Sequence, residues 1–404
     1  MMKDAAQRRW GSTVAILALI SGTAVAVIYL PQTLLINLAQ SFGVTPAVAG
    51  ITATTIQIGY AVGIFLLVPL ADRVQPRIQV AVQTLALVAA ILVSVVLPSI
   101  GAVALGFAVA GLVANVAQVI LPAANRLAPS GRAGSTTATL IGSWLAGIFG
   151  GRIVAGVLVD AIGWRGVLIL FAVLLLILLP FAHQALRADE RVPFAGGSYI
   201  RLLGSTVTLI FRSPTVGQSV ALQLLVFTTF NSFWTVAALY LTGPAVGWTA
   251  LGAGLFGFVG LAVVLFVPAV GRLITRFGQI PIAGAGLLLA LIASLSLVVD
   301  HEIVPLYAVS MFLIALSQQV TQSAVQSRLL ASNPSAPGQA NTVFMFFMFI
   351  GGALGAFLGP WGYAHGGLTQ VAIQSAGLIC VSLLVWLAIV LRASRRASQR
   401  GTNG

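Results

Sequence analysis

Arg152 is the one ionisable side chain that lies well inside an apolar stretch of this chain. A charged side chain in hydrocarbon is costly, and it usually serves binding or coupling. A guanidinium offers several N–H donors and favours an anion or a polarised carbonyl as its partner. Two simpler interpretations stay open, because Arg152 can also extend toward the outer end of its stretch or pair with Asp160 two turns further on.

Amide and aromatic side chains are the other groups suited to hold a solute. An amide both donates and accepts hydrogen bonds, so it can bind a neutral solute from either side. All seven acidic residues lie outside the apolar stretches or at their ends, so a permanent cation would lack a counter-charge inside them. We therefore predict neutral or anionic solutes, although aromatic rings can also hold cations. The predicted substrate cavity comprises Tyr29, Gln32, Gln57, Asn115, Gln118, Arg152, Gln223, Asn231, Trp234, Gln318, Gln319, Gln322 and Asn341.

Other chemistries lack the residues that they need. The sequence has no Gly-x-x-x-x-Gly-Lys motif, and Lys3 is its only lysine, so ATP is not expected to drive the protein. The histidines, His183, His301 and His365, lie near the ends of apolar stretches, and Cys380 is the only cysteine. We predict no catalytic residues, no metal site and no cofactor, and hence no enzyme.

The elements that must position these residues are membrane-spanning helices. The 404-residue chain is 59% hydrophobic and 7% charged, too apolar to cover itself with polar surface in water. Stretches of about 20 apolar residues, long enough to cross a bilayer, predict an all-α membrane protein with twelve transmembrane helices. They lie at residues 12–36, 47–70, 78–98, 101–124, 137–160, 166–185, 215–241, 250–270, 280–299, 303–325, 340–364 and 370–391.

The stretches fall into two sets of six. We predict an N-terminal six-helix bundle over residues 1–185, a cytosolic linker over 186–214, and a C-terminal bundle with a basic tail over 215–404. Apolar residues spaced along one face of the linker predict an interfacial helix there. Spans three, six, nine and twelve carry the fewest polar residues at mid-span, so we expect them to face lipid.

Positive charge predicts the orientation. With both termini cytoplasmic, every lysine and arginine except Arg152 and Arg165 falls on the inner side. This partition explains the net charge of +13 as topology plus attraction to anionic membrane lipid. Nucleic-acid binding by the tail is the weaker interpretation, and we predict no nucleic-acid partner. The expected location is a bacterial inner membrane, and the expected state is a monomer.

A short charged stretch and its counterpart half a chain later mark two repeats. Asp72, Arg73 and Arg77 follow the second span, and Gly271, Arg276 and Gly278 follow the eighth. The first resembles the Gly-x-x-x-Asp-Arg-x-Gly-x-Arg signature of the major facilitator superfamily, with Val68 and Gln75 in place of the two glycines. The second has Thr275 in place of the aspartate.

The resemblance implies two six-helix bundles related by a pseudo-two-fold axis, which rock to alternate access. It also implies that the charged loops lock the cytosolic side, with Arg126 and Arg132 as candidate partners of Asp72. Within the superfamily, the chain looks like the bacterial drug- or arabinose-efflux-like branch. That branch implies export of a small organic compound, with H⁺ as the expected coupling ion in an antiport. An importer or uniporter is the alternative, and a membrane receptor or scaffold is a remote one.

Glycine recurs every fourth or fifth residue in two spans that are half a chain apart. Such a stripe allows close approach of two helix backbones, either as fixed packing or as a sliding contact during opening and closing. The stripes consist of Gly147, Gly151 and Gly156 in span five and of Gly351, Gly355 and Gly359 in span eleven.

Overall fold

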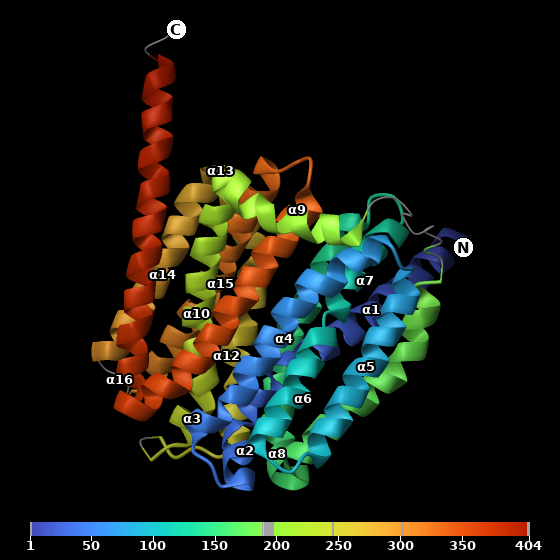
Figure 1. The fold of residues 1–404 in the computed structure, drawn as a ribbon, viewed down its shortest axis with the longest axis vertical. Helices are drawn as coiled ribbons and strands as arrows, with labels where there is room; N and C mark the ends of the chain where they lie inside the picture. The colour runs from blue at the N-terminus through green and yellow to red at the C-terminus, as the bar shows by residue number, and fades with distance from the viewer. Residues whose placement is uncertain (1, 188, 190–197, 245, 300–302, 402–404) are drawn as a thin grey trace. The chain divides into compact units, whose positions relative to one another are not determined.

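The computed structural model describes residues 2–187, 189, 198–244, 246–299 and 303–401, without the side chains of residues 2–9, 72, 393 and 395–401. Every regular element in this part of the chain is a helix (Figure 1). The first half contains α1 (Met2–Thr33), α2 (Leu35–Phe42), α3 (Pro46–Ala49), α4 (Ile51–Leu67), η1 (Val68–Asp72), α5 (Pro76–Val96), α6 (Ile100–Val113), α7 (Val116–Leu127) and α8 (Ala133–Ala185). The rest contains α9 (Tyr199–Arg212), α10 (Pro214–Thr242), α11 (Ala250–Leu255), α12 (Gly257–Leu261), η2 (Ala262–Phe266), α13 (Val267–Phe277), α14 (Gln279–Val299), α15 (Val304–Ser332) and α16 (Pro337–Gly401).

Ten helical segments of the described chain are long and apolar enough to cross a membrane. Two of them, Ala133–Ala185 and Pro337–Arg392, have 53 and 56 residues, far more than one crossing needs. Each contains a break in helical geometry, at Gly163 with φ 67° and at Gly367 with φ 63°. Only glycine enters this left-handed region at low cost. Both breaks lie between two predicted spans, where the sequence predicts a turn.

Three predicted spans are divided into shorter helices. Span two consists of α3, α4 and η1, span four of α6 and α7, and span eight of α11, α12, η2 and α13. The interruption in span four has a local cause. The Asn115 side chain donates to the carbonyl of Leu112 at 3.0 Å, and such side-chain bonds to the backbone compete with the helical pattern.

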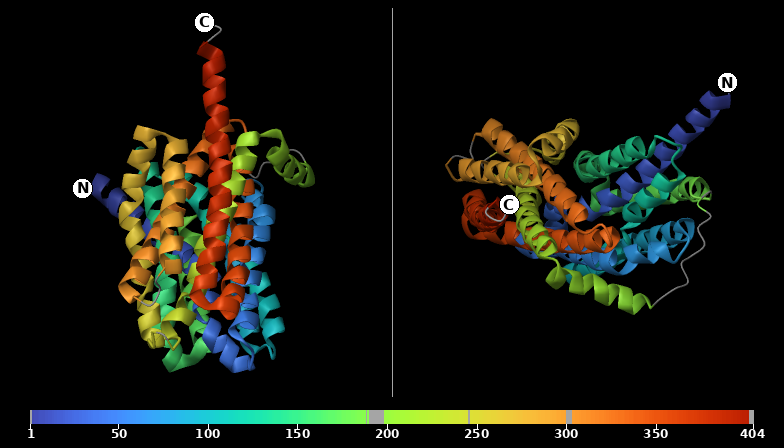
Figure 2. Two further views of the ribbon diagram at one scale, coloured as in Figure 1. Left: turned by 90° about the vertical axis from the view of Figure 1, so that its left-hand side faces the viewer. Right: turned by 90° about the horizontal axis from the view of Figure 1, so that it is seen from above.

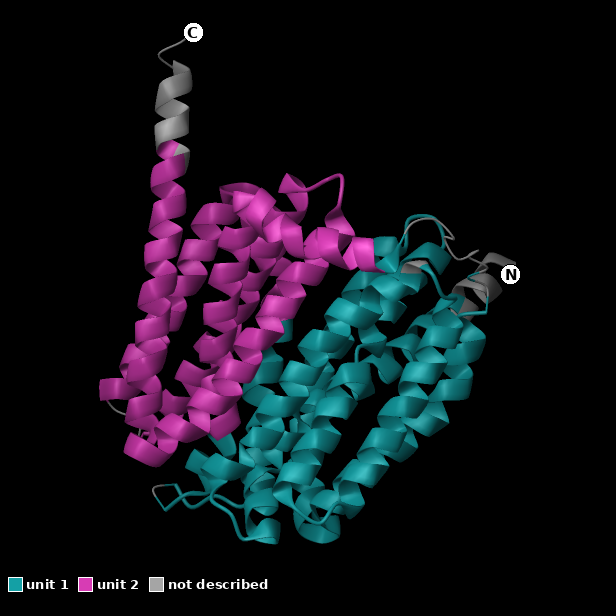
Figure 3. Ribbon diagram, in the orientation of Figure 1, with its two compact units in different colours: residues 1–199, 237–264 teal, residues 200–236, 265–404 magenta. Residues whose placement is uncertain are grey.

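The chain forms two compact units (Figure 3). Unit 1 consists of residues 1–199 and 237–264, and unit 2 consists of residues 200–236 and 265–404. Unit 1 thus includes a segment from the second half of the sequence, namely the end of α10, α11, α12 and the start of η2. The division into bundles at residues 185 and 215 remains a prediction.

Helix α8 is central to the packing of unit 1. It contacts α1 and α5, and it is also contacted by α11 and α12 from the 237–264 segment. Helices α4 and α6 form a second close pair, in which Gly59 and Gly111 leave no room for a β-carbon.

In unit 2, α14 lies beside both α15 and α16, as both views of Figure 2 show. Large apolar side chains are exposed along α14 and the second part of α16, for example Ile292 at 58% and Leu384 at 66%. The same holds for α5 and the second part of α8. These are the four spans expected to face lipid.

Helix α9 occupies the predicted interfacial position in the linker. It exposes Ile200 and Phe211 at 79% and 84%, and it carries Arg201 and Arg212. Exposed apolar and basic side chains on one short helix are typical of a helix at the membrane surface.

Candidate functional site

Arg152 lies buried within unit 1, with an exposed fraction of 6%. Its Nη2 donates to Oε1 of Gln32 at 2.5 Å, and its Nη1 donates to the carbonyl of Ile148 at 3.0 Å. Its guanidinium carbon lies 5.0 Å from the ring centre of Tyr29 and 5.6 Å from that of Phe149. Arg152 is therefore held against α1 rather than extended outward, and Asp160 is not among its partners within the described chain.

Two tyrosines extend this cluster to α4 and α7. Tyr29 lies beside Gln57, and Tyr60 lies beside Gln118. Both tyrosines are almost fully buried. The structure thus brings together five predicted cavity residues, which we call the Arg152 cluster: Tyr29, Gln32, Gln57, Gln118 and Arg152. Tyr60 was not predicted, although its position three residues after Gln57 places both on one face of a helix.

Asn115 belongs to a different contact. Its Oδ1 accepts from Nε2 of Gln83 at 2.9 Å, which joins α5 to the junction between α6 and α7. Gln79, the other amide of α5, donates to the carbonyl of Leu67 at 2.6 Å. The amides of α5, a helix expected to face lipid, therefore point toward neighbouring helices and donate hydrogen bonds to them.

The predicted cavity residues of unit 2 lie on α10, α15 and α16. On α10, Gln223 is fully buried, Asn231 donates to the carbonyl of Phe227 at 3.2 Å, and Trp234 packs near Phe230. Neither polar atom of the Gln223 side chain has a hydrogen-bond partner among the described residues.

The remaining predicted cavity residues of unit 2 lie on α15 and α16. Gln318 donates to Gln322 at 3.2 Å and Gln319 donates to Ser323 at 3.1 Å, both one turn along the same helix. Asn341 of α16 accepts from Gln326 at 2.7 Å. Arg328, which follows the predicted span 303–325, lies in α15 and donates to Gln218 of α10 at 2.7 Å.

The first charged loop contacts the start of α9. The guanidinium of Arg73 lies 5.6 Å from the ring centre of Tyr199, and the Tyr199 hydroxyl donates to the carbonyl of Leu66. Burial raises the pKa of Tyr199 while the charge of Arg73 opposes it, so the hydroxyl keeps its proton at neutral pH. Arg77 donates to Gln75 at 2.9 Å.

The pairing of Asp72 with Arg126 or Arg132 remains a prediction. The Asp72 side chain lies outside the described residues. Arg126, one of its two expected partners, forms an ion pair with Asp189 at 2.6 Å. Asp189 stands in the predicted linker, so this pair ties the linker to the end of α7.

The second charged loop is built without the aspartate. Thr275, which replaces it, donates to the carbonyl of Gly271 within α13 at 3.1 Å. Arg276 lies 5.2 Å from the ring centre of Phe277. Gly278 ends α13 with φ 87°, a value that favours glycine.

Both glycine stripes make close backbone contacts. A β-carbon at Gly147 would lie 2.2 Å from the carbonyl oxygen of Gly22 in α1, and one at Gly151 would lie 2.7 Å from Cβ of Ala26. A β-carbon at Gly156 would lie 2.5 Å from Cα of Gly254 in α11. The first stripe therefore contacts two different partners, α1 and α11.

The second stripe contacts a single partner. β-carbons at Gly351, Gly355 and Gly359 would lie 2.2–2.5 Å from the carbonyl oxygens of Leu224, Thr228 and Ser232, all on α10. These contacts agree with the fixed-packing interpretation, and sliding remains a prediction.

Comparison with known proteins identifies similar chains. The family model described as Major Facilitator Superfamily matches residues 12–327. A probable transporter of Streptomyces coelicolor, SCO4007, is 30% identical over 94% of this chain and 87% of its own length. The uncharacterized transporter YgaY of Escherichia coli O157:H7 is 29% identical over 92% of this chain and 94% of its own.

Solved structures share the fold at low sequence identity. A mutant of the nucleoside transporter NupG superposes with a TM-score of 0.76 at 14% identity and covers 93% of this chain and 99% of its own. A POT family transporter in complex with 5-aminolevulinic acid gives 0.74 at 14% identity, with coverages of 95% and 96%.

Proposed function

Because the chain belongs to the major facilitator superfamily, and is therefore a multi-pass membrane transporter and not an enzyme, we propose that it exports a small neutral or anionic organic compound in exchange for protons. The proposed mechanism is alternating access. Export and proton exchange follow from the resemblance to efflux transporters, and the sequence offers no phosphate-binding loop for ATP as the alternative energy source.

The proposed topology has twelve spans in a bacterial inner membrane, with both termini cytoplasmic. Ten long apolar helical segments of the described chain support the number of spans. Two of these segments break at a glycine into two pieces that are each long enough to cross the membrane, which gives twelve. The distribution of arginine supports the orientation.

The Arg152 cluster is the observation on which the substrate class rests. A guanidinium keeps its charge under all ordinary conditions, because its intrinsic pKa lies far above neutrality. Around it, the hydrogen-bonding partners given above are an amide and a backbone carbonyl, and the two adjacent rings are uncharged. The guanidinium of Arg152 attracts an anion or the negative end of a carbonyl. Gln32, Gln57 and Gln118 supply further donors and acceptors for the uncharged parts of a solute.

The proposed charged-loop lock stays part of this mechanism. Arg73 and Tyr199 link the first loop to the start of α9. A movement of this loop would therefore displace the linker. Asp72 is proposed to hold the cytosolic side closed in one of the two states.

Transport by purified protein in proteoliposomes with an imposed pH gradient tests the proposal. Arg152→Ala is expected to lower transport of organic anions roughly tenfold or more, since a charge-assisted hydrogen bond contributes about 1.5–3 kcal/mol, and to lower transport of neutral compounds less. Arg187→Ala, which removes an exposed arginine just after α8, is the matched control and is expected to leave both rates unchanged.

Different results would replace parts of the proposal. Robust export of a quaternary ammonium dye that Arg152→Ala does not affect would overturn the substrate class. Transport that does not respond to the pH gradient, or that is directed inward, would favour a uniporter or an importer instead.

A further inference from the structure

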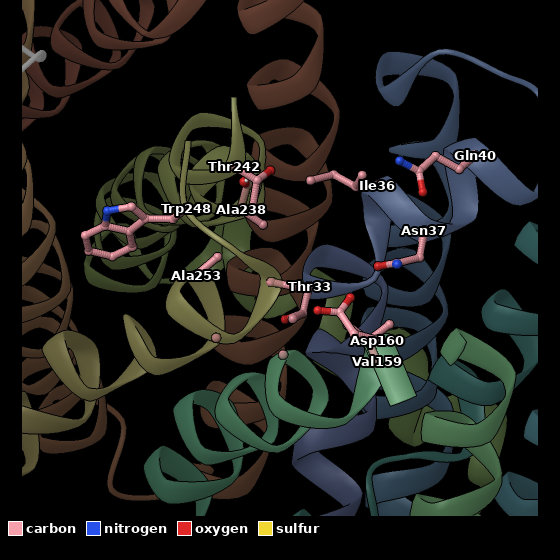
Figure 4. A pocket seen from close by; sticks show the side chains of 13 residues that line it. Thr33, Ile36, Asn37, Gln40, Val159, Asp160, Ala238, Thr242, Trp248 and Ala253 are labelled. Atoms are coloured by element: carbon pink, nitrogen blue, oxygen red, sulfur yellow. Dashed lines mark hydrogen bonds between the residues drawn. The ribbon is translucent and has the colours of Figure 1, made fainter. Parts of the chain in front are cut away.

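A polar cavity lies in unit 1, apart from the Arg152 cluster (Figure 4). It has a volume of about 280 Å³. Its polar walls are formed by Thr33 at the end of α1, Asn37 and Gln40 on α2, Asp160 on α8 and Thr242 at the end of α10. Residues of α11 complete the wall. We call it the Asp160 cavity.

A glycine contact separates this cavity from Arg152. Arg152, Gly156 and Asp160 follow one another at intervals of four residues, so they share one face of α8. Between the two charged residues, Gly156 packs directly against Gly254 of α11, and both glycines also line the cavity. The same face of α8 therefore carries a cationic site and an anionic site on opposite sides of a closed backbone contact.

The charge and hydrogen-bonding groups of the cavity point to a cationic donor. Asp160 is the only charged residue among the 13 described residues that line it. In Figure 4 the side chains of Asp160, Thr33 and Asn37 point toward one another. Oγ1 of Thr33 is buried and has no hydrogen-bond partner among the described residues. Asp160 is exposed. A carboxylate, a hydroxyl oxygen and an amide oxygen together can accept three hydrogen bonds from one ammonium group.

The size of the cavity distinguishes an organic ligand from a metal ion. Its volume is roughly nine times the 30 Å³ that one water molecule occupies in the liquid. A bare cation needs a compact set of oxygen ligands, and the described residues contain no group of three or more metal-ligating side chains. The cavity instead approaches the lower limit of pockets that hold small organic molecules.

We propose that the Asp160 cavity binds a small organic compound through a primary ammonium group, with Asp160 as the counter-charge and Thr33 and Asn37 as hydrogen-bond acceptors. This ligand differs in charge from the neutral or anionic substrate proposed for the Arg152 cluster. The proposal therefore does not depend on that substrate class.

Binding would also affect the glycine contact. The cavity walls come from α1, α2 and α8 on one side and from residues 238–254 on the other. A ligand that contacts both sides binds only while they are together, so it stabilises the Gly156–Gly254 contact by its differential affinity for that state. With the proposed topology, the ligand reaches the cavity from outside the cell.

Calorimetry tests the proposal by measuring the binding of ethanolamine to the full chain. The chain is held in nanodiscs that contain no ethanolamine lipids. Ethanolamine is expected to bind, and Asp160→Asn is expected to weaken it at least roughly tenfold, because the isosteric amide removes the charge-assisted bond. Thr33→Val is expected to weaken binding severalfold. Asp189→Asn removes a carboxylate that pairs with Arg126 instead, and it is expected to leave the affinity unchanged.

Three comparison ligands sharpen the result. Ethylene glycol lacks the charge and tetramethylammonium lacks the N–H donors, so neither is expected to bind detectably. Absence of ethanolamine binding to the parent chain, or equal affinity in Asp160→Asn, would overturn the proposal. Binding of Na⁺ in preference to ethanolamine would overturn it in favour of a metal ion. Thermal unfolding of each variant shows that a loss of binding does not arise from misfolding.

Discussion

Buried glutamines show how one residue type can have different roles. Gln83 on α5 donates to Asn115 and so joins two elements of unit 1. Gln223 on α10 is equally buried, yet neither atom of its amide has a described hydrogen-bond partner. A buried polar group without a partner costs free energy, and it is retained most readily where a ligand supplies the missing hydrogen bond.

Replacement of each glutamine by leucine separates these roles. Gln83→Leu leaves Oδ1 of Asn115 without its donor and is expected to lower the free energy of unfolding by about 1–3 kcal/mol. Gln223→Leu is expected to keep or raise the thermal unfolding midpoint and to lower transport. A lower midpoint for Gln223→Leu than for Gln83→Leu would show that the Gln223 amide is bonded within the protein.

At the scale of helices, glycines determine which faces meet. The stripe on α16 places three consecutive turns against carbonyl oxygens of α10, whereas the stripe on α8 passes from α1 to α11 between Gly151 and Gly156. Without a hydrophobic driving force between helices in lipid, such close packing supplies much of the association. The helices α10 and α16 therefore depend on these positions.

Gly355→Ala tests this dependence. Its added β-carbon would lie 2.2 Å from the carbonyl oxygen of Thr228, so the substitution is expected to cost about 1–3 kcal/mol of stability. Gly377→Ala on the same helix is the matched control, because no atom lies within 4 Å of the added carbon. It is expected to be neutral or to gain up to about 1 kcal/mol from helix propensity. Equal unfolding midpoints for the two variants would argue against the close packing.

For the whole molecule, orientation in the membrane is the property on which both proposed sites depend. The distribution of arginine predicts that both termini and position 73 are cytosolic, and that positions 45 and 165 face outward. Only with this orientation does the Asp160 cavity open to the outside.

Single cysteines introduced into a Cys380→Ser background measure the orientation. In intact cells, an impermeant thiol reagent is expected to label a cysteine at position 165 or 45 and to leave one at position 73 unlabelled. Cys380 is exposed and must be removed first. Labelling at 73 but not at 165 would reverse the proposed topology.

Asp72→Asn tests the proposed lock. Loss of its charge is expected to leave insertion intact and to shift the population toward the state that is open on the cytosolic side. A change of about 1 kcal/mol in the balance would alter the ratio of the two states roughly fivefold. Distances between spin labels across the cytosolic face report the shift. Unchanged distances together with normal transport would mean that Asp72 is an ordinary loop charge.

Local physics made the helices and their turns predictable from sequence. Lipid requires each crossing segment to be apolar and to satisfy its own backbone, so the apolar stretches coincide with helices. Gly163 and Gly367 adopt positive φ at the turns expected near them. The charged loops and the glycine stripes were visible because they depend on residue type and spacing alone.

Only the tertiary structure decided which polar groups meet. Gln32 and Arg152 are 120 residues apart, and Asp160 faces Thr33 and Asn37 across a similar separation. The sequence placed all these residues near helix interiors or ends, but it could not show which helix faces lie together. Asn115 joined Gln83 instead of the Arg152 cluster, and Arg126 paired with Asp189. The physical reason is that polarity determines whether a side chain must be satisfied, whereas the packing of helices determines by which partner.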